Sequence, residues 1–234
     1  MKKIILAILS IAFISFQTNA QTADEIIEKN IKSMGGAEKL KSIESLVFEG
    51  QVNSQGMEIP ITITTLKNKG WRMEINVMGM SGWMIVRPDS GWVFMPFQGQ
   101  SKPEAMTQDQ LKESIEQLDL EGELVNYKEK GHTVEYIGMD DVEGTECHKL
   151  KILTKSGNVH YELIDPVSFF TVRKISKQKA GGKEVEVQTD LGNYKEVEGG
   201  FMFPHTITSM GGPFELKKIT VNGKISPDKF TAGM

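Results

Sequence analysis

Residues 71–77 read Trp-Arg-Met-Glu-Ile-Asn-Val, an alternation of apolar and polar side chains that recurs along most of the chain. Successive side chains of a β-strand point to opposite faces, so a period of two places all four apolar residues of this stretch on one face. Residues 57–64 and 184–191 alternate in the same way. The pattern predicts half-buried strands.

Clusters of glycine, asparagine and serine separate these stretches at short intervals. They stand at residues 53–56, 68–70, 79–82, 89–91, 156–158, 181–182, 199–200 and 211–212. Connections this short join antiparallel neighbours, which predicts a meander of ten or eleven strands. Because strand twist accumulates across a long sheet with one apolar face, we expect this sheet to curl.

Two segments depart from the alternation and are predicted to be helical. Thr22 and Glu25 have the spacing of a capping box, and apolar residues then recur at helical spacing until Gly35. Residues 103–124 place four apolar residues near helical spacing among many polar ones. Both helices are amphipathic, so we expect them to cover the concave face of the curled sheet.

The N-terminus has the three parts of a signal peptide. Lys2 and Lys3 precede an almost unbroken apolar run over residues 4–16, and Thr18-Asn19-Ala20 supplies small residues before Gln21. We predict cleavage after Ala20, export to the periplasm, and a mature chain of residues 21–234 that forms a single β domain. A membrane-spanning helix needs about 20 apolar residues, and no stretch of the mature chain offers them.

Cysteine and charge narrow the possible partners. Cys147 is the only cysteine, so the chain can form no internal disulfide. The residue directly after Ala20 is Gln21 and not a cysteine, so we expect no lipid anchor at the cleavage point. The formal net charge is −4, with basic and acidic residues interleaved. A nucleic-acid surface requires a clustered positive stripe, so we expect no nucleic-acid partner.

The sequence holds no recognisable catalytic motif. It lacks a nucleophile elbow, a phosphate-binding glycine loop and an HExxH pair. His160 and Glu162 would share one face of a strand, but a metal site usually needs three or four converging ligands. We therefore predict no enzymatic activity, no catalytic residue, no metal and no cofactor, although a triad assembled from distant segments would leave no pattern to find.

Apolar side chains are concentrated between residues 71 and 97, which contain all three tryptophans. In residues 82–97 both strand faces are apolar, so one face needs a further partner: another layer, the mid-chain helix or a ligand. Methionine is also abundant here and adapts to flexible apolar shapes. A filled core competes with a cavity as the explanation. The predicted cavity lining is Trp71, Met73, Ile75, Trp83, Ile85, Trp92, Phe94, Met106, Leu111 and Ile115.

Several short motifs occur together in a familiar order. They are Met34-Gly35-Gly36-Ala37-Glu38-Lys39-Leu40, residues 45–50, residues 71–74, Asp89-Ser90-Gly91-Trp92-Val93-Phe94-Met95-Pro96, and Gly199-Gly200-Phe201-Met202-Phe203-Pro204, followed by Ile207 and a last strand to about Val221. Across nearly the whole mature chain they resemble the periplasmic lipoprotein-carrier (LolA/LolB-like) superfamily of outer membrane lipoprotein-sorting proteins.

The resemblance implies an unclosed β barrel of about eleven strands wrapped over helices, with an apolar cavity for lipoprotein acyl chains. It implies a carrier or chaperone in the periplasm, expected to be a monomer, with lipids or acyl chains and an envelope receptor or transporter as partners. In such carriers an arginine in an early loop holds a helical lid closed. The turn at residues 67–70 lacks the expected Arg-Pro pair, which leaves Arg72 as the nearest candidate. The alternative is an envelope interaction or sensory module with a filled core.

Overall fold

A computed structural model describes residues 15–54, 56–180 and 183–232 of the chain. Most of the predicted signal peptide, residues 1–14, lies outside the described residues, so the prediction of cleavage after Ala20 stays a prediction. No helix within the described ranges has both the length and the apolar character needed to cross a membrane.

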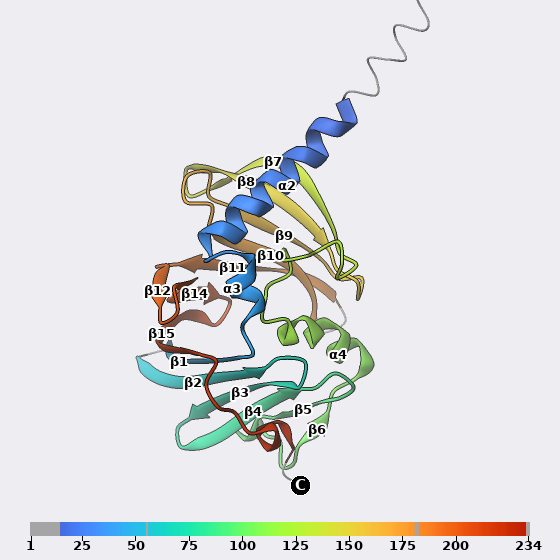
Figure 1. The fold of residues 1–234 in the computed structure, drawn as a ribbon. Helices are drawn as coiled ribbons and strands as arrows, with labels where there is room; N and C mark the ends of the chain where they lie inside the picture. Colours follow the sequence, from blue (N-terminus) through green and yellow to red (C-terminus); the bar gives the residue numbers. More distant parts are fainter. Residues whose placement is uncertain (1–14, 55, 181–182, 233–234) are drawn as a thin grey trace, which may run out of the picture.

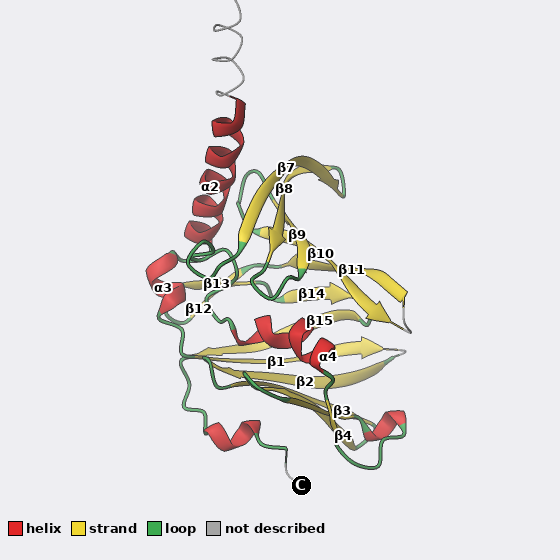
Figure 2. Cartoon of the chain, turned by 90° about the vertical axis from the view of Figure 1, so that its right-hand side faces the viewer, coloured by secondary structure: helices red, strands yellow, loops and turns green. Residues whose placement is uncertain are grey.

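One antiparallel sheet dominates the molecule (Figures 1 and 2). Its strands are β1 (Ser45–Ser54), β2 (Met57–Leu66), β3 (Gly70–Val77), β4 (Met80–Val86), β5 (Gly91–Phe94), β6 (Glu104–Ala105), β7 (Thr133–Val142), β8 (Thr145–Leu153), β9 (Val159–Ile164), β10 (Thr171–Ala180), β11 (Lys183–Gly192), β14 (Thr206–Ser209) and β15 (Gly212–Val221). A separate two-stranded ribbon joins β12 (Lys195–Val197) to β13 (Phe201–Phe203).

The large sheet consists of two meanders that meet at the β1–β15 pair. Its order is β6-β5-β4-β3-β2-β1-β15-β14-β11-β10-β9-β8-β7. Among the described residues, β6 and β7 are edge strands and do not pair with each other, so the sheet is not closed. The predicted fold class, a mainly β chain with an unclosed antiparallel sheet and few helices, is confirmed, with thirteen strands in the sheet where about eleven were expected.

The helices lie near the predicted segments. They are α2 (Ser15–Ser33), α3 (Ala37–Lys41) and α4 (Gln108–Ser114), with short 3₁₀ turns η1 (Pro96–Gln98), η2 (Ile115–Leu118) and η3 (Pro227–Phe230). Gly35 and Gly36 have φ of 116° and 94° and end the first helix as predicted. The predicted start at Thr22 is wrong for the uncut chain, because the preceding residues continue the helix from Ser15.

Apolar clusters fix these helices against the sheet. Ala23, Ile26 and Ile27 of α2 pack with Leu150 and Ile152 of β8. Figure 2 shows α4 lying across the middle of the curled sheet. Both predicted helices therefore cover the sheet, as expected.

The C-terminal turn η3 packs on the face of β3 that points away from α4. Phe230 of η3 is only 2% exposed, and its ring lies against Gly70, where any side chain would clash with it. Glycine at this position is therefore a steric requirement of the C-terminal contact.

Phe230→Ala should lower the free energy of unfolding by about 3–5 kcal/mol, because it leaves a large cavity beside β3. Urea denaturation measures the change. Val167→Ala, at a position 87% exposed, is the control and should stay within about 0.5 kcal/mol of the wild type. An unchanged urea midpoint for Phe230→Ala would show that η3 does not belong to the cooperatively folded domain.

Candidate functional site

The mid-chain helix lies on one apolar face of the sheet. Leu111 of α4 and Leu118 of η2 are buried against Trp71 of β3 and Val86 of β4. A capping box fixes the start of α4: the Gln110 backbone N–H donates to Thr107 Oγ1 (3.2 Å), and the Thr107 backbone N–H donates to Gln110 Oε1 (2.9 Å). The helix thus presents its apolar side to the concave face of β3 and β4.

Five of the ten predicted cavity residues come together here, and a sixth lies on the same strand face. Trp71, Met73, Met106, Leu111 and Ile115 belong to one apolar cluster. Ile75 alternates with Met73 on β3 and therefore shares its face. The period-two pattern on β3 and the helical spacing after residue 103 predicted that these residues face one another, and their role as the lining of a ligand cavity stays a prediction.

The other four predicted residues lie on the opposite face. Arg72 of β3 lies opposite Ile85 of β4, which lies opposite Trp92 of β5. In the same way Glu74 lies opposite Trp83, which lies opposite Phe94. Directly opposed residues share a face, so Trp83, Ile85, Trp92 and Phe94 point away from Trp71 and Met73. The ten residues therefore do not line a single space, because β4 and β5 carry apolar side chains on both faces.

The concave face is only partly covered. Ile63, Met73 and Met84 contact the cluster beneath α4 but remain partly exposed. Only Leu111 of α4 and only Leu118 of η2 are buried, so these two short elements cover the apolar surface only in part. Apolar area therefore remains available for another contact.

Arg72, the predicted lid-lock residue, lies on the face away from α4. Its Nη1 donates to the Lys229 carbonyl (3.2 Å), its Nε lies 3.2 Å from Glu74 Oε1, and its guanidinium stacks on the Trp83 ring at 5.2 Å. These contacts tie β3 to the C-terminal turn and give no basis for a lock on the mid-chain helix.

A lysine from the β2–β3 turn instead contacts the mid-chain segment, which comprises residues 98–125. Lys67 Nζ donates to the Lys41 carbonyl (2.8 Å) and lies 2.8 Å from Glu121 Oε1, and Lys130 Nζ lies 2.6 Å from Asp119 Oδ2. The Glu121 carboxylate raises the pKa of Lys67. Burial opposes ionisation of Glu121, but the lysines outweigh it and lower the pKa of that carboxyl. Sequence patterns predicted no role for Lys67, and this turn was noted only because it lacks the Arg-Pro pair.

A pocket of about 860 Å³ opens beside these ion pairs. Its lining residues are Lys67, Asn68, Pro88, Ile115, Glu116, Leu118, Asp119, Leu120, Glu121, Lys130, His132, Lys155 and Ser156. Ligand sites in proteins commonly have volumes of about 300–1,000 Å³. The pocket combines apolar side chains of the mid-chain segment with charged groups from the β2–β3 and β8–β9 turns.

Lys67→Met should lower the free energy of unfolding by about 1–2 kcal/mol near neutral pH, because it removes a half-buried ion pair and a charged hydrogen bond. The folded pKa of Glu121 lies below its ordinary value of 4.5, so the stabilisation is fully present above that pH and is lost as the pH falls through the lowered pKa. Urea denaturation at several pH values measures both effects.

Lys69→Met is the matched control, since Lys69 is exposed in the same turn. It should change stability by less than about 0.5 kcal/mol. Equal losses in the two variants, or a loss independent of pH, would contradict the assigned ion pair.

Comparison with known proteins bears on the fold. No protein-family model matches the chain, and no curated protein matches its sequence. A solved domain described as an outer membrane lipoprotein-sorting protein, from Vibrio parahaemolyticus, is 12% identical over 91% of this chain and 97% of that chain, with a TM-score of 0.53. A LolA superfamily protein from Nitrosomonas europaea is 13% identical over 89% and 97%, with a TM-score of 0.53. The predicted LolA-like fold is confirmed.

Proposed function

We propose that this protein is an exported, non-enzymatic carrier or chaperone that binds acyl chains between the concave face of β2–β4 and the mid-chain segment. The observation that carries the proposal is the incomplete cover of that face, where Ile63, Met73 and Met84 stay partly exposed beneath α4. The two solved proteins of similar fold are named for lipoprotein sorting and for the LolA superfamily, which agrees with the proposal.

Burial of hydrocarbon is sufficient to drive such binding. Each methylene removed from water contributes about 0.8 kcal/mol, so six methylenes supply roughly 5 kcal/mol without a specific polar contact. Partly exposed methionines on the concave face can adjust to acyl chains of different shape. The charged rim of the adjacent pocket would remain hydrated beside a polar head group.

Entry of the ligand requires part of the mid-chain segment to move. Leu124 and Val125 are buried in two different apolar clusters and fix the end of the segment. The movable part therefore lies between β6, which pairs with β5, and Leu124, and residues 107–118 carry α4 away from β3. The Lys67–Glu121 pair stands at the boundary between the moving and fixed parts.

Export is compatible with the packing of α2. The residues of this helix that pack on β8 and β9, Ala23, Ile26 and Ile27, all follow the predicted cleavage site at Ala20. In Figure 1 the first turns of α2 extend beyond the sheet. Cleavage there would leave these apolar contacts in place.

Met73→Glu should weaken binding of a fluorescent fatty acid at least tenfold, because it places an uncompensated charge against the acyl chain. Fluorescence titration measures the dissociation constant. Met210→Glu, at a position 74% exposed in the β14–β15 turn, is the matched control and should bind as the wild type does. If the two variants bind the fatty acid with equal affinity, the concave face of β2–β4 is not the binding site.

Protein purified from its native envelope should carry a lipid or lipopeptide. Organic extraction and mass spectrometry should recover it at near-stoichiometric amounts, because dissociation of a buried acyl chain into water is unfavourable. A lipid-free protein that co-purifies with a specific envelope protein would contradict the carrier and support an interaction module with a filled core.

A further inference from the structure

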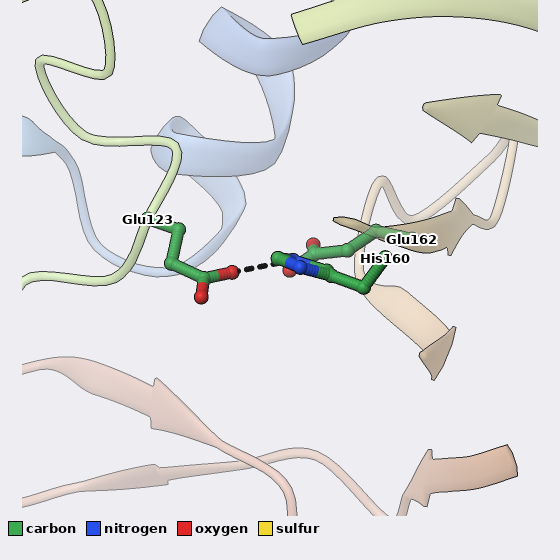
Figure 3. Close-up of side chains that lie close together, drawn as sticks. All are labelled: Glu123, His160 and Glu162. Carbon is green, nitrogen blue, oxygen red and sulfur yellow. Dashed lines mark ion pairs between the residues drawn. The ribbon is translucent and has the colours of Figure 1, made fainter. Parts of the chain in front are cut away.

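Three potential metal ligands converge on the concave side of the other half of the sheet. His160 and Glu162 alternate on β9 and share a face, as the sequence predicts, and Glu123 approaches them from the segment that follows η2 (Figure 3). One ligand atom from each side chain lies within 4.8 Å of the other two. The neighbouring Leu124 and Val125 are buried and hold Glu123 in this position.

Two of the ligand atoms, one from His160 and one from Glu123, face each other directly. His160 is only 9% exposed, and its Nε2 lies 2.6 Å from Glu123 Oε2. The pair has the distance of an ion pair, but neither atom makes a hydrogen bond of acceptable geometry within the described residues. The two groups form an ion pair and are each other's partner, so a divalent ion that displaces the proton between them would keep both atoms satisfied.

We propose that Glu123, His160 and Glu162 bind a divalent transition metal ion of the zinc class. An imidazole nitrogen and carboxylate oxygens are donors that zinc accepts, at about 2.0–2.2 Å. Tetrahedral ligands at those bond lengths lie about 3.3 Å apart, so His160 and Glu123 must separate by under about 1 Å when the ion enters. Water completes the coordination.

The surroundings of Glu162 orient its carboxylate and limit the affinity of the site. Its Oε2 accepts a hydrogen bond from Thr171 Oγ1 (3.0 Å), and its Oε1 lies 2.6 Å from Lys174 Nζ. Each oxygen keeps a further lone pair for a metal. The Lys174 ammonium repels a dication, so Glu123 and His160 make the dominant bonds and the affinity is moderate.

A bound ion would connect the mid-chain segment to the sheet. Glu123 belongs to the mid-chain segment, which Leu124 and Val125 anchor, whereas His160 and Glu162 belong to β9. The metal would therefore reinforce the fixed end of the segment and leave α4 free to move. This role is independent of whether an acyl chain is the ligand.

The test is titration of the purified, metal-free protein with Co²⁺, followed by visible absorption, and with Zn²⁺ in competition with a chromophoric chelator. We expect one ion per chain, displacement of Co²⁺ by Zn²⁺, and a higher melting temperature with Zn²⁺. His160→Gln and Glu123→Gln should each weaken binding at least tenfold and abolish the thermal shift.

Two controls separate this site from adventitious binding. His148→Gln replaces a partly buried strand histidine, and Asp140→Asn replaces a carboxylate that pairs with Lys149. Both should bind the ions as the wild type does. The proposal is overturned if the wild type binds no stoichiometric ion, an outcome that needs no variant to fold, or if folded His160→Gln and Glu123→Gln retain wild-type affinity.

Discussion

The pairing of β1 with β15 is the interaction on which the rest of the structure depends. It joins two meanders, built from residues 45–105 and residues 133–221, into one continuous sheet. The register shifts between Glu49 and Gly50, where a side chain would clash with the Glu215 carbonyl and the Phe214 ring. A bulge of this kind increases local twist, which bends the sheet where its two halves meet. The concave space exists because the first and last strands are partners.

The segment between the two meanders connects the halves a second time. Leu118 packs with Trp71 on β3, Leu124 packs with the α2 cluster, and Val125 packs with the cluster around Ile43. The chain therefore crosses the concave side and contacts three separate apolar groups within eight residues. Three carboxylates lie between these contacts: Asp119 and Glu121 pair with lysines at the rim, and Glu123 pairs with His160, because uncompensated burial of carboxylates would be costly.

Local patterns predicted most of the fold. Alternation in residues 71–77 gave β3, and the glycine pair at residues 35–36 gave the end of α2, because period and backbone conformation act within a few residues. The face on which each residue of β4 and β5 lies did not follow, because Trp83 and Met84 are both apolar and only pairing with β3 distinguishes them. Glu123 and Lys67 were missed for a similar reason, since their partners are distant in sequence.

The open edges of the sheet have a mechanical consequence. A closed barrel has a circumference fixed by its strand number and stagger, so its interior cannot widen without breaking backbone hydrogen bonds. Here β6 and β7 are the two edge strands, and β6 contains only two residues. Opening the halves about the β1–β15 pair would therefore break no strand ladder, and only the crossing mid-chain segment and the side chains between the halves would resist it. The spacing between them is set by the side chains that fill it.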